Sequence, residues 1–521
     1  MATEAPRLTL PSTDSGTRTA VRSAPEAAAC PAAGAPGGRP GDATVGSPLG
    51  ATTATTTTPT ATATAVLPPE LGEDRVAAWQ GSGRQLIALL TEARELGPVS
   101  RFRLGGRQTL LVTGPEQVQH VLAQHPDRYV KRSHRARPLL GDGVVCASGQ
   151  AWKDQRRLLQ PQFTSTGLRR HEHRIAGAAR AAAGRWAAKA RTGEPTDVGE
   201  DMRLFALDAV WRCLTGLALD EDTRRELASV EAVVAALPTA DAGPEAGRAA
   251  MAADLARIDA SAERAIATVR GLAAGLAAGP GEAAGAGEPT RPGEAAATGE
   301  TAGAEQDGTG LLHLLLETAK SRPEYTDRLI RDELVTLLVA GHETTAQTLA
   351  WLFLLLDRHP EVREWLAAAD RPDSPVGRGE ALHALVSETL RLYPAVWLIP
   401  RHAPADDVLD GYRVEAGSDI LICPYLTHRD PGLWPDPERF DPTRFLTAGR
   451  RPVRPGAYYP FGVGGRACLG LRFAMRTTAV LLDLLLPHYM PVFRSTPDGA
   501  VFGADLRPDG PMPARIEVRR P

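Results

Sequence analysis

The segment FGVGGRACLG, residues 461–470, surrounds one cysteine with the groups that make a thiol reactive. Cys468 follows a turn rich in glycine and precedes a run with apolar residues at helical spacing, residues 469–486. Backbone amides and the positive end of a helix dipole favour a thiolate over a thiol at such a position. Glycines leave those amides accessible to the sulfur. The pattern predicts an anionic sulfur at the start of a helix, with Arg466 able to reach an acidic group on the same ligand.

Three other interpretations apply to a lone cysteine. Free cysteine is often a small buried hydrophobe. The order Gly462-x-Gly464-x-x-Ala467 fits a loose dinucleotide fingerprint, but too little chain follows it to complete such a domain. A structural zinc site needs closely paired ligands. The cysteines of this chain show no such pairing: Cys30, Cys146, Cys213, Cys423 and Cys468.

A second candidate site interrupts the apolar run DELVTLLVAGHETTAQTLAWLFLLL. Apolar residues continue on both sides of AGHETT, which predicts one long buried helix over residues 332–356. Buried Glu343 and Thr344 are costly unless they are paired or functional. A zinc-protease motif is excluded, because Ala346 stands where its second histidine belongs. A kink stabilised by threonine hydroxyls and a functional site both remain open.

Two further pairs of residues stand at helical spacing. Trp152 and Arg156 lie four apart and share one face of a predicted helix. An indole N–H beside a guanidinium can bind an anion, although a solvated basic helix face has the same pattern. Glu388 and Arg391 lie three apart on a helix that ends before Pro394. Their apolar neighbours predict a buried ion pair, which needs further partners.

Two segments of low complexity stand apart from the chain that must position these residues: one precedes it and the other interrupts it. Residues 1–65 are rich in Ala, Thr, Pro, Gly and Ser, a composition that predicts a disordered tail. Residues 279–310 are rich in Gly, Ala and Glu, and we expect a flexible loop insertion there. The remainder, residues 66–521, is expected to form one domain.

Helical patterns dominate that domain, beginning with the one that contains Leu86 and Leu90. Strands are expected at residues 99–104 and 109–113, and the only convincing later strands fall within residues 411–422. Helix therefore outweighs strand, and the predicted fold class is mainly α.

Composition excludes several classes of function. The net charge of −3 gives no general attraction to nucleic acid or acidic lipid. Five scattered cysteines argue against a disulfide framework and fit a reducing cytoplasm. The longest apolar stretch, residues 334–356, is broken by His342, Glu343 and Gln347, which disfavours a membrane span. We expect a cytoplasmic monomer without a membrane anchor and without a nucleic-acid partner.

The cysteine segment is similar to a known signature. FGVGGRACLG matches the pattern Phe-x-x-Gly-x-Arg-x-Cys-x-Gly of the cytochrome P450 family at every fixed position, including Phe461, Gly464 and Gly470. Motifs in the family's order begin at Trp152. The resemblance implies the cytochrome P450 fold, a helix-rich triangular prism with small β-sheets. It also implies that Cys468 ligates the iron of heme b as an axial thiolate.

The same resemblance implies roles for the other motifs. AGHETT is similar to the family's oxygen-activation motif, in which Ala340 makes room for dioxygen while Glu343 and Thr344 deliver protons. Several residues would bind the heme propionates. They are Trp152, Arg156, Arg401 and Arg466, with His134 as a further candidate.

The buried pair resembles two members of the family's Glu-Arg-Arg triad. Its third member would be Arg439, in the segment PERF at residues 437–440. With Glu388 and Arg391 it would lock the cysteine loop in place, which is a structural role and not a catalytic one.

The resemblance finally implies a monooxygenase that inserts one oxygen atom from O2 into an apolar small molecule. A polyketide or terpenoid of secondary metabolism is the expected substrate, hydroxylated or epoxidised beside residues 139–145, Val396 and Ile399. A separate ferredoxin and ferredoxin reductase would supply electrons, docking near Arg472 and Arg476. The alternative is a heme-thiolate protein that senses gases or carries a ligand without turnover, and AGHETT argues against it.

Overall fold

The computed structural model describes residues 65–131, 133, 136–228, 230, 233, 234, 246–278, 310–446 and 453–519. All of them fall within one unit of the chain, residues 59–521. The predicted tail and the predicted insertion lie outside the described residues, apart from residues 65 and 310 at their edges. His134 lies outside them as well.

Helices dominate the described chain, so the prediction of a mainly α protein is confirmed. They are α1 (Glu73–Gly81), α2 (Leu86–Arg94), α3 (Pro115–Gln119), α4 (Arg137–Leu140), α5 (Gly149–Leu159), α6 (Ser165–Arg169), α7 (Glu172–Thr192), α8 (Val198–Thr215), α9 (Glu221–Leu227), α11 (Ala246–Ala278), α12 (Leu311–Ala319), α13 (Asp327–Arg358), α14 (Pro360–Ala368), α15 (Arg378–Leu392), α16 (Pro424–Thr427) and α17 (Leu471–Leu485). Three short helical turns add to these: η2 (His120–Gln124), η3 (Gln160–Phe163) and η6 (Pro442–Phe445). Among the described residues, no helix is both long and apolar enough to cross a membrane.

The strands form small sheets. They are β1 (Val99–Leu104), β2 (Arg107–Val112), β3 (Thr196–Asp197), β4 (Ile399–His402), β5 (Asp407–Leu409), β6 (Tyr412–Val414), β7 (Asp419–Ile422), β8 (Tyr489–Phe493), β9 (Ala500–Phe502), β10 (Leu506–Pro508) and β11 (Pro513–Val518). The largest sheet has the order β1-β2-β7-β4, in which only β2 and β7 are parallel.

The expected strands β1, β2, β6 and β7 are present, but the expectation of no other later strands is wrong. β4, β5 and β8 to β11 also form. Most of these strands are only three to five residues long, and an alternation of apolar and polar residues cannot be recognised over so short a stretch. The two-residue β3 exists only because Asp197 and its neighbour pair with β11, more than 300 residues further on.

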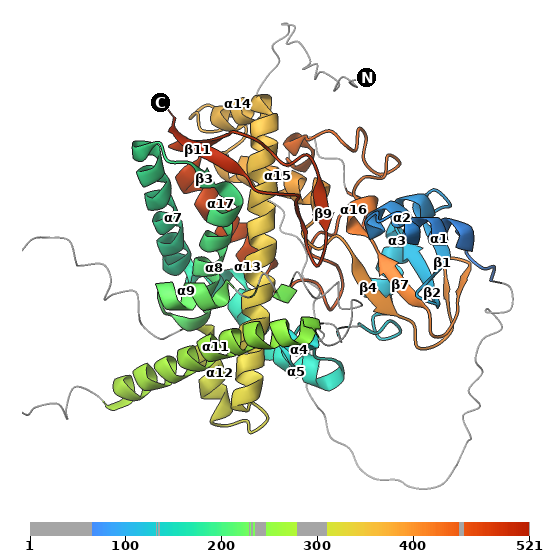
Figure 1. Cartoon of the computed structure of the whole chain (residues 1–521), viewed down its shortest axis with the longest axis horizontal. Coiled ribbons are helices and arrows are strands. Elements are labelled where there is room, and N and C mark those ends of the chain that lie inside the picture. The colour runs from blue at the N-terminus through green and yellow to red at the C-terminus, as the bar shows by residue number, and fades with distance from the viewer. Residues whose placement is uncertain are drawn as a thin grey trace, which may run out of the picture. The chain divides into compact units, whose positions relative to one another are not determined.

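The central element is α13, which runs beside α8 and contacts α15 and α17 (Figure 1). It begins after Thr326, whose hydroxyl accepts a hydrogen bond from the amide of Leu329 at 3.3 Å. Its two ends pack into the two largest apolar clusters, one from residues 349–356 and the other from residues 330–338. The predicted buried helix is therefore confirmed, and it leaves the polar residues at its middle between the two clusters.

Candidate active site

The cysteine loop closes on itself by backbone hydrogen bonds. The amide of Cys468 donates to the carbonyl of Phe461 at 2.8 Å, and the amide of Ala467 donates to that of Gly464 at 3.0 Å. Gly464 has φ +75°, and a β-carbon there would lie 2.1 Å from the carbonyl oxygen of Leu122. Only glycine fits both the backbone angle and the space. The loop therefore holds the sulfur immediately before α17, as predicted.

The groups expected to stabilise a thiolate are present, but their effect on the pKa of Cys468 is smaller than that of burial. Burial raises the pKa of the Cys468 thiol, while the amides of Gly470 and Leu471 and the charge of Arg156 lower it. The amides thus act in the expected direction, but burial outweighs them and the net shift of the pKa is upward. A coordinated metal ion would deprotonate the thiol outright.

Cationic side chains gather beside this loop. Arg156 donates to the carbonyl of Ala467 at 2.9 Å, and Arg466 donates to that of Ala147 at 3.0 Å. Cζ of Arg466 lies 4.2 Å from the centroid of the Trp152 ring, and that of Arg156 lies 5.8 Å from it. The two helix-spaced residues and the loop arginine thus form one group at the pocket wall.

Two further cations join this group. Arg401 of β4 lines the same pocket, as does Lys131, whose ammonium donates to the carbonyl of Val145 at 2.9 Å. Burial lowers the pKa of Arg401 to about 10 and that of Lys131 to about 8, and neighbouring arginines add to both shifts. Sequence reasoning missed Lys131, because a single lysine in a loop has no spacing that marks it.

The cluster has a net positive charge that its surroundings do not balance. Within the described residues, Lys131, Arg156, Arg401 and Arg466 bond only to backbone carbonyls and form no ion pair with a carboxylate. Like charges held together in a partly desolvated site favour binding of an anion. A ligand that carries acid groups near the sulfur therefore fits this wall of the pocket.

The polar centre of α13 faces the same cavity. The Thr344 hydroxyl donates to the carbonyl of Ala340 at 2.8 Å, and both residues line the pocket. A β-carbon on Gly341 would lie 2.9 Å from a methyl group of Val210. Gly341 thus permits close packing of α13 on α8.

Glu343 lines the pocket from a buried position. Its Oε1 lies 2.9 Å from Nε2 of His342, close but not aligned as a hydrogen bond, and Gln347 donates to its Oε2 at 3.5 Å. Burial raises the pKa of Glu343, but His342, Arg203 and Gln347 together outweigh this effect and the net shift is downward. The side chain is therefore an anionic carboxylate at neutral pH.

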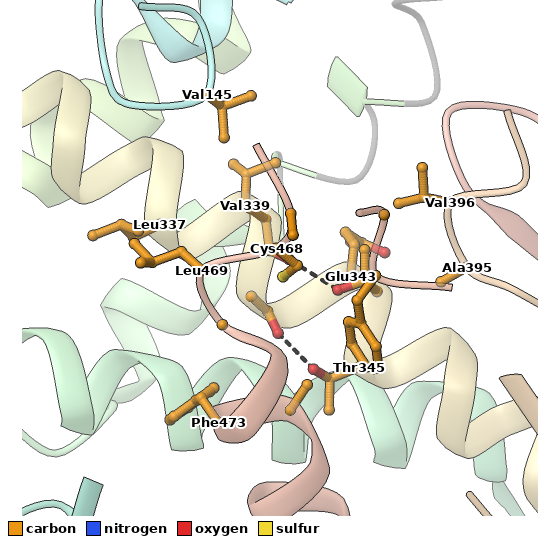
Figure 2. Close-up of a pocket in the computed structure, with 18 of the residues that line it drawn as sticks. Val145, Leu337, Val339, Glu343, Thr345, Ala395, Val396, Cys468, Leu469 and Phe473 are labelled. Atoms are coloured by element: carbon orange, nitrogen blue, oxygen red, sulfur yellow. Dashed lines mark hydrogen bonds between the residues drawn. The ribbon is translucent and has the colours of Figure 1, made fainter. Parts of the chain in front are cut away.

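The pocket between these groups has a volume of about 510 Å³, within the range of small-molecule sites. Figure 2 shows Val145, Leu337, Val339 and Val396 around the pocket that Cys468 also faces. Cys468 is accessible from this cavity although protein surrounds it. The expected wall residues Val396, Ile399 and those near Val144 are brought together, and many of the side chains around them are aliphatic.

The buried ion pair ties α15 to the chain between His428 and Arg439. Arg391 donates to both carboxylate oxygens of Glu388, at 2.7 and 2.8 Å, and both side chains are fully buried. Its remaining donors reach three backbone carbonyls. They are those of His428 at 2.9 Å, Pro437 at 2.6 Å and Arg439 at 3.0 Å.

The third arginine of this group is Arg444, so the assignment of Arg439 is wrong. Arg439 contributes its carbonyl, and its residue is exposed. Nε of Arg444 lies 3.4 Å from Oε1 of Glu388, and the amide of Asp441 donates to the same oxygen at 2.9 Å. The pattern Pro-x-Arg-Phe occurs twice, at residues 437–440 and 442–445, and the second copy would have supplied the correct residue.

A comparison with protein families decides the identity. The family model described as Cytochrome P450 matches residues 79–245 and 294–496, more than half of the chain. The chain belongs to the cytochrome P450 family. It is similar to the crystal structure of the cytochrome P450DA heme domain, with a TM-score of 0.70 and 24% identity over 88% of this chain and 98% of that one. The expected P450 fold is therefore confirmed.

Curated relatives include two proteins of Streptomyces melanosporofaciens. Cyclooctatin synthase is 30% identical over 77% of this chain and 84% of its own length. Cyclooctat-9-en-7-ol 5-monooxygenase is 29% identical over 81% of this chain and 87% of its own length. The chain is a P450 monooxygenase, an oxidoreductase whose heme iron has a cysteine axial ligand.

The residues of the pocket fit this cofactor. Within the described residues, no group of three or more His, Cys, Asp or Glu side chains could hold a metal ion. The single sulfur of Cys468 suits an iron that brings its other ligands in a porphyrin. The unbalanced cations supply partners for the two propionates, which are the acid groups that this wall of the pocket requires.

Proposed function

We propose that this P450 is a tailoring enzyme of secondary metabolism that hydroxylates or epoxidises a terpenoid or polyketide. The observation that carries the proposal is the aliphatic part of the pocket wall, which includes Leu337, Val339 and Val396. The polar residues of α13 beside it are Glu343, Thr344, Thr345 and Thr348. The aliphatic part of the wall favours a hydrocarbon skeleton. The two relatives from Streptomyces support the terpenoid class, since one is named for a cyclooctat-9-en-7-ol.

Each residue of the site has a proposed task. Heme, bound by the Cys468 thiolate, supplies the binding and activation of dioxygen. Arg156, Arg401 and Arg466 orient it through its propionates, Trp152 packs against two of these arginines, and Lys131 joins them. Phe461, Gly464 and Gly470 shape the loop that presents the sulfur.

Protons are proposed to reach the reacting oxygen through α13. The hydroxyl of Thr344 lies at the cavity, and the anionic carboxylate of Glu343, the preceding residue of α13, lines the same cavity. A hydroxyl backed by a carboxylate can pass on a proton without itself becoming charged. No feature of the described residues favours the alternative of a gas sensor or ligand carrier.

Electrons are proposed to come from a separate ferredoxin and its reductase. The chain would act as a cytoplasmic monomer, with the donor docking on the side of α17. Arg472 and Arg476 are exposed there, a few residues beyond the sulfur. Positive charge at that place would attract an acidic ferredoxin.

The test is a panel of cyclic terpenes, macrolide-type polyketides and long-chain fatty acids added to the heme-loaded protein. We expect terpenes or polyketides to displace water and shift the Soret band, and turnover under ¹⁸O2 to add one labelled atom. The Thr344→Ala variant serves as a control, because it should show the shift with little product. A shift with fatty acids alone would contradict the proposed substrate class.

A further inference from the structure

The loop at residues 139–147 forms part of the cavity wall, and its backbone is held by side chains of α13. The amide of Asp142 donates to Oδ2 of Asp332 at 2.9 Å. The amide of Val144 donates to Oε2 of Glu333 at 3.0 Å. Two consecutive carboxylates of the helix therefore accept hydrogen bonds from alternate amides of the loop.

Two more side chains of the same helix bind carbonyls at the start of the loop. Thr336 donates to Leu140 at 3.1 Å, and Arg331 donates to Leu139 at 2.9 Å. Gly143 lies so close to the helix that a β-carbon there would stand 2.2 Å from Oγ1 of Thr336. The loop is thus fitted against one side of α13.

The other side of the loop is held by cations of the heme pocket. Lys131 donates to the carbonyl of Val145 and Arg466 to that of Ala147. The loop lies between carboxylates on α13 and ammonium or guanidinium groups beside the cofactor. Its position therefore depends on groups at both of its faces.

The burial of Glu333, whose carboxylate binds the amide of Val144, costs folding free energy. Glu333 is fully buried, and its Oε1 has no hydrogen-bond partner among the described residues. It forms no ion pair in that part of the chain, whereas the neighbouring Asp332 lies 2.9 Å from Arg331. A half-satisfied buried carboxylate destabilises a fold, and a leucine would avoid this cost. Stability alone does not account for the residue.

We propose that Glu333 is a positioning residue that sets ligand specificity by fixing Val144 and Val145 in the cavity wall. The proposal rests on the assignment of this cavity as the substrate site. With the amide of Val144 bound, the wall presents one shape, so a large ligand meets an ordered surface. Without that bond, a large ligand must order the wall as it binds, while a small ligand at the iron never touches it.

The experiment compares two azoles that ligate heme iron but differ in size. Imidazole needs little space beyond the iron, and clotrimazole fills the cavity with its aryl rings. Each is titrated into heme-loaded wild type, Glu333→Leu and Glu333→Gln, following the Soret shift. The control is Glu317→Leu, which removes an exposed carboxylate of α12 whose one ion pair within the described residues is with Lys320.

We expect Glu333→Leu to weaken clotrimazole at least tenfold and to leave imidazole within twofold of wild type. Glu333→Gln keeps an oxygen acceptor for the amide and should restore clotrimazole binding to within threefold. An unchanged ratio of the two affinities in Glu333→Leu would overturn the proposal, and so would a Glu333→Gln variant as impaired as Glu333→Leu.

A second variant reaches the same loop without altering the acid. Gly143→Ala forces the loop away from Thr336, so we expect the same selective loss of clotrimazole binding. This result decides the matter if Glu333→Leu fails to retain heme. Equal affinities in Gly143→Ala and wild type would then contradict the role of the loop's position. Normal imidazole binding in any variant shows that the heme site itself is intact.

Discussion

Glu388 and Arg391 illustrate how one buried charge pair depends on a third side chain. Both are fully buried, and Arg444, itself largely buried, lies next to Glu388 Oε1. Replacing Arg444 by alanine removes a positive charge beside a buried carboxylate, which should cost about 1–3 kcal/mol. Arg439→Ala keeps the backbone carbonyl that Arg391 uses and should cost less than about 0.5 kcal/mol.

The measurement is the thermal unfolding midpoint of the heme-loaded variants at one scan rate. Arg391→Ala sets the upper limit, because it leaves Glu388 buried without its main partner, at a cost of about 3–5 kcal/mol. If Arg439→Ala proved as damaging as Arg444→Ala, the exposed arginine would have a structural role that its position does not explain.

Thr344 is the residue at which a catalytic role can be separated from a structural one. Its hydroxyl bonds within α13, so Thr344→Ala should leave the helix and the bound heme unchanged. Proton delivery should suffer, and the ratio of product to NADPH consumed should fall roughly tenfold, with hydrogen peroxide replacing product. Thr344→Ser should recover most of the coupling. Equal coupling in Thr344→Ala and wild type would remove Thr344 from the proposed relay.

Glu333 makes a prediction about pH. Burial raises its pKa to about 7, and Asp332 adds to the shift, although the amide of Val144 opposes it. Below about pH 4.5 the group is protonated in both the folded and the unfolded chain and costs nothing. Between about pH 4.5 and 7 only the unfolded chain loses the proton, so stability falls as pH rises, by about 3 kcal/mol in total.

Glu333→Gln should abolish this fall in stability with rising pH, because glutamine does not titrate. The variant and wild type should unfold at similar temperatures at pH 5, and the variant should be the more stable of the two at pH 8. Thermal unfolding of both proteins at the two pH values isolates the contribution of Glu333 from all other titrating groups. A difference in stability that does not change with pH would contradict the raised pKa.

At the scale of elements, the sequence predicted best what is determined locally. The cysteine loop and the uninterrupted α13 follow from residues close together in the chain. The same is true of α5, which carries Trp152 and Arg156, and of α15, which carries Glu388 and Arg391. The third arginine was misassigned, because a local match to PERF could not show which of two copies turns toward Glu388. Lys131 and the bonds between Glu333 and Val144 join distant segments, and no single-sequence pattern records them.

The cysteine loop offers a matched pair of glycines for a test at this scale. Gly464 has a left-handed backbone and no room for a β-carbon, because Leu122 of η2 lies against it. The nearest neighbour of a β-carbon on Gly465 would be Trp152, at an acceptable 3.7 Å. Gly464→Ala should therefore displace the sulfur and reduce the heme retained per chain several-fold, while Gly465→Ala should retain it.

Heme content and the absorbance of the reduced carbon monoxide complex report this difference. The band shifted to the red by a sulfur ligand should weaken in Gly464→Ala and persist in Gly465→Ala. Equal heme retention in the two variants would show that the loop tolerates displacement from η2.

At the scale of the whole molecule, α13 joins the two main apolar clusters and carries both the proposed proton relay and the carboxylates that hold the cavity loop. The sulfur approaches from the opposite wall, at the start of α17. Substrate and dioxygen would thus meet on the α13 side, and electrons would enter from the α17 side. Because the two functions occupy different faces of the pocket, they can be disturbed separately.

The proposed docking of ferredoxin can be tested with two arginines on one helix. Arg476 pairs with Glu172 at 3.1 Å, whereas Arg472 forms no ion pair within the described residues. Arg472→Glu should therefore slow electron transfer from added ferredoxin more than Arg476→Glu does, by about tenfold at low ionic strength. The effect should fade above about 0.3 M salt, where exposed charges are screened. Stopped-flow reduction under carbon monoxide measures the rate, with Arg103→Glu as a control on β1, which lies well apart from α17 (Figure 1). A loss that is independent of salt, or one equally large in Arg103→Glu, would contradict docking at α17.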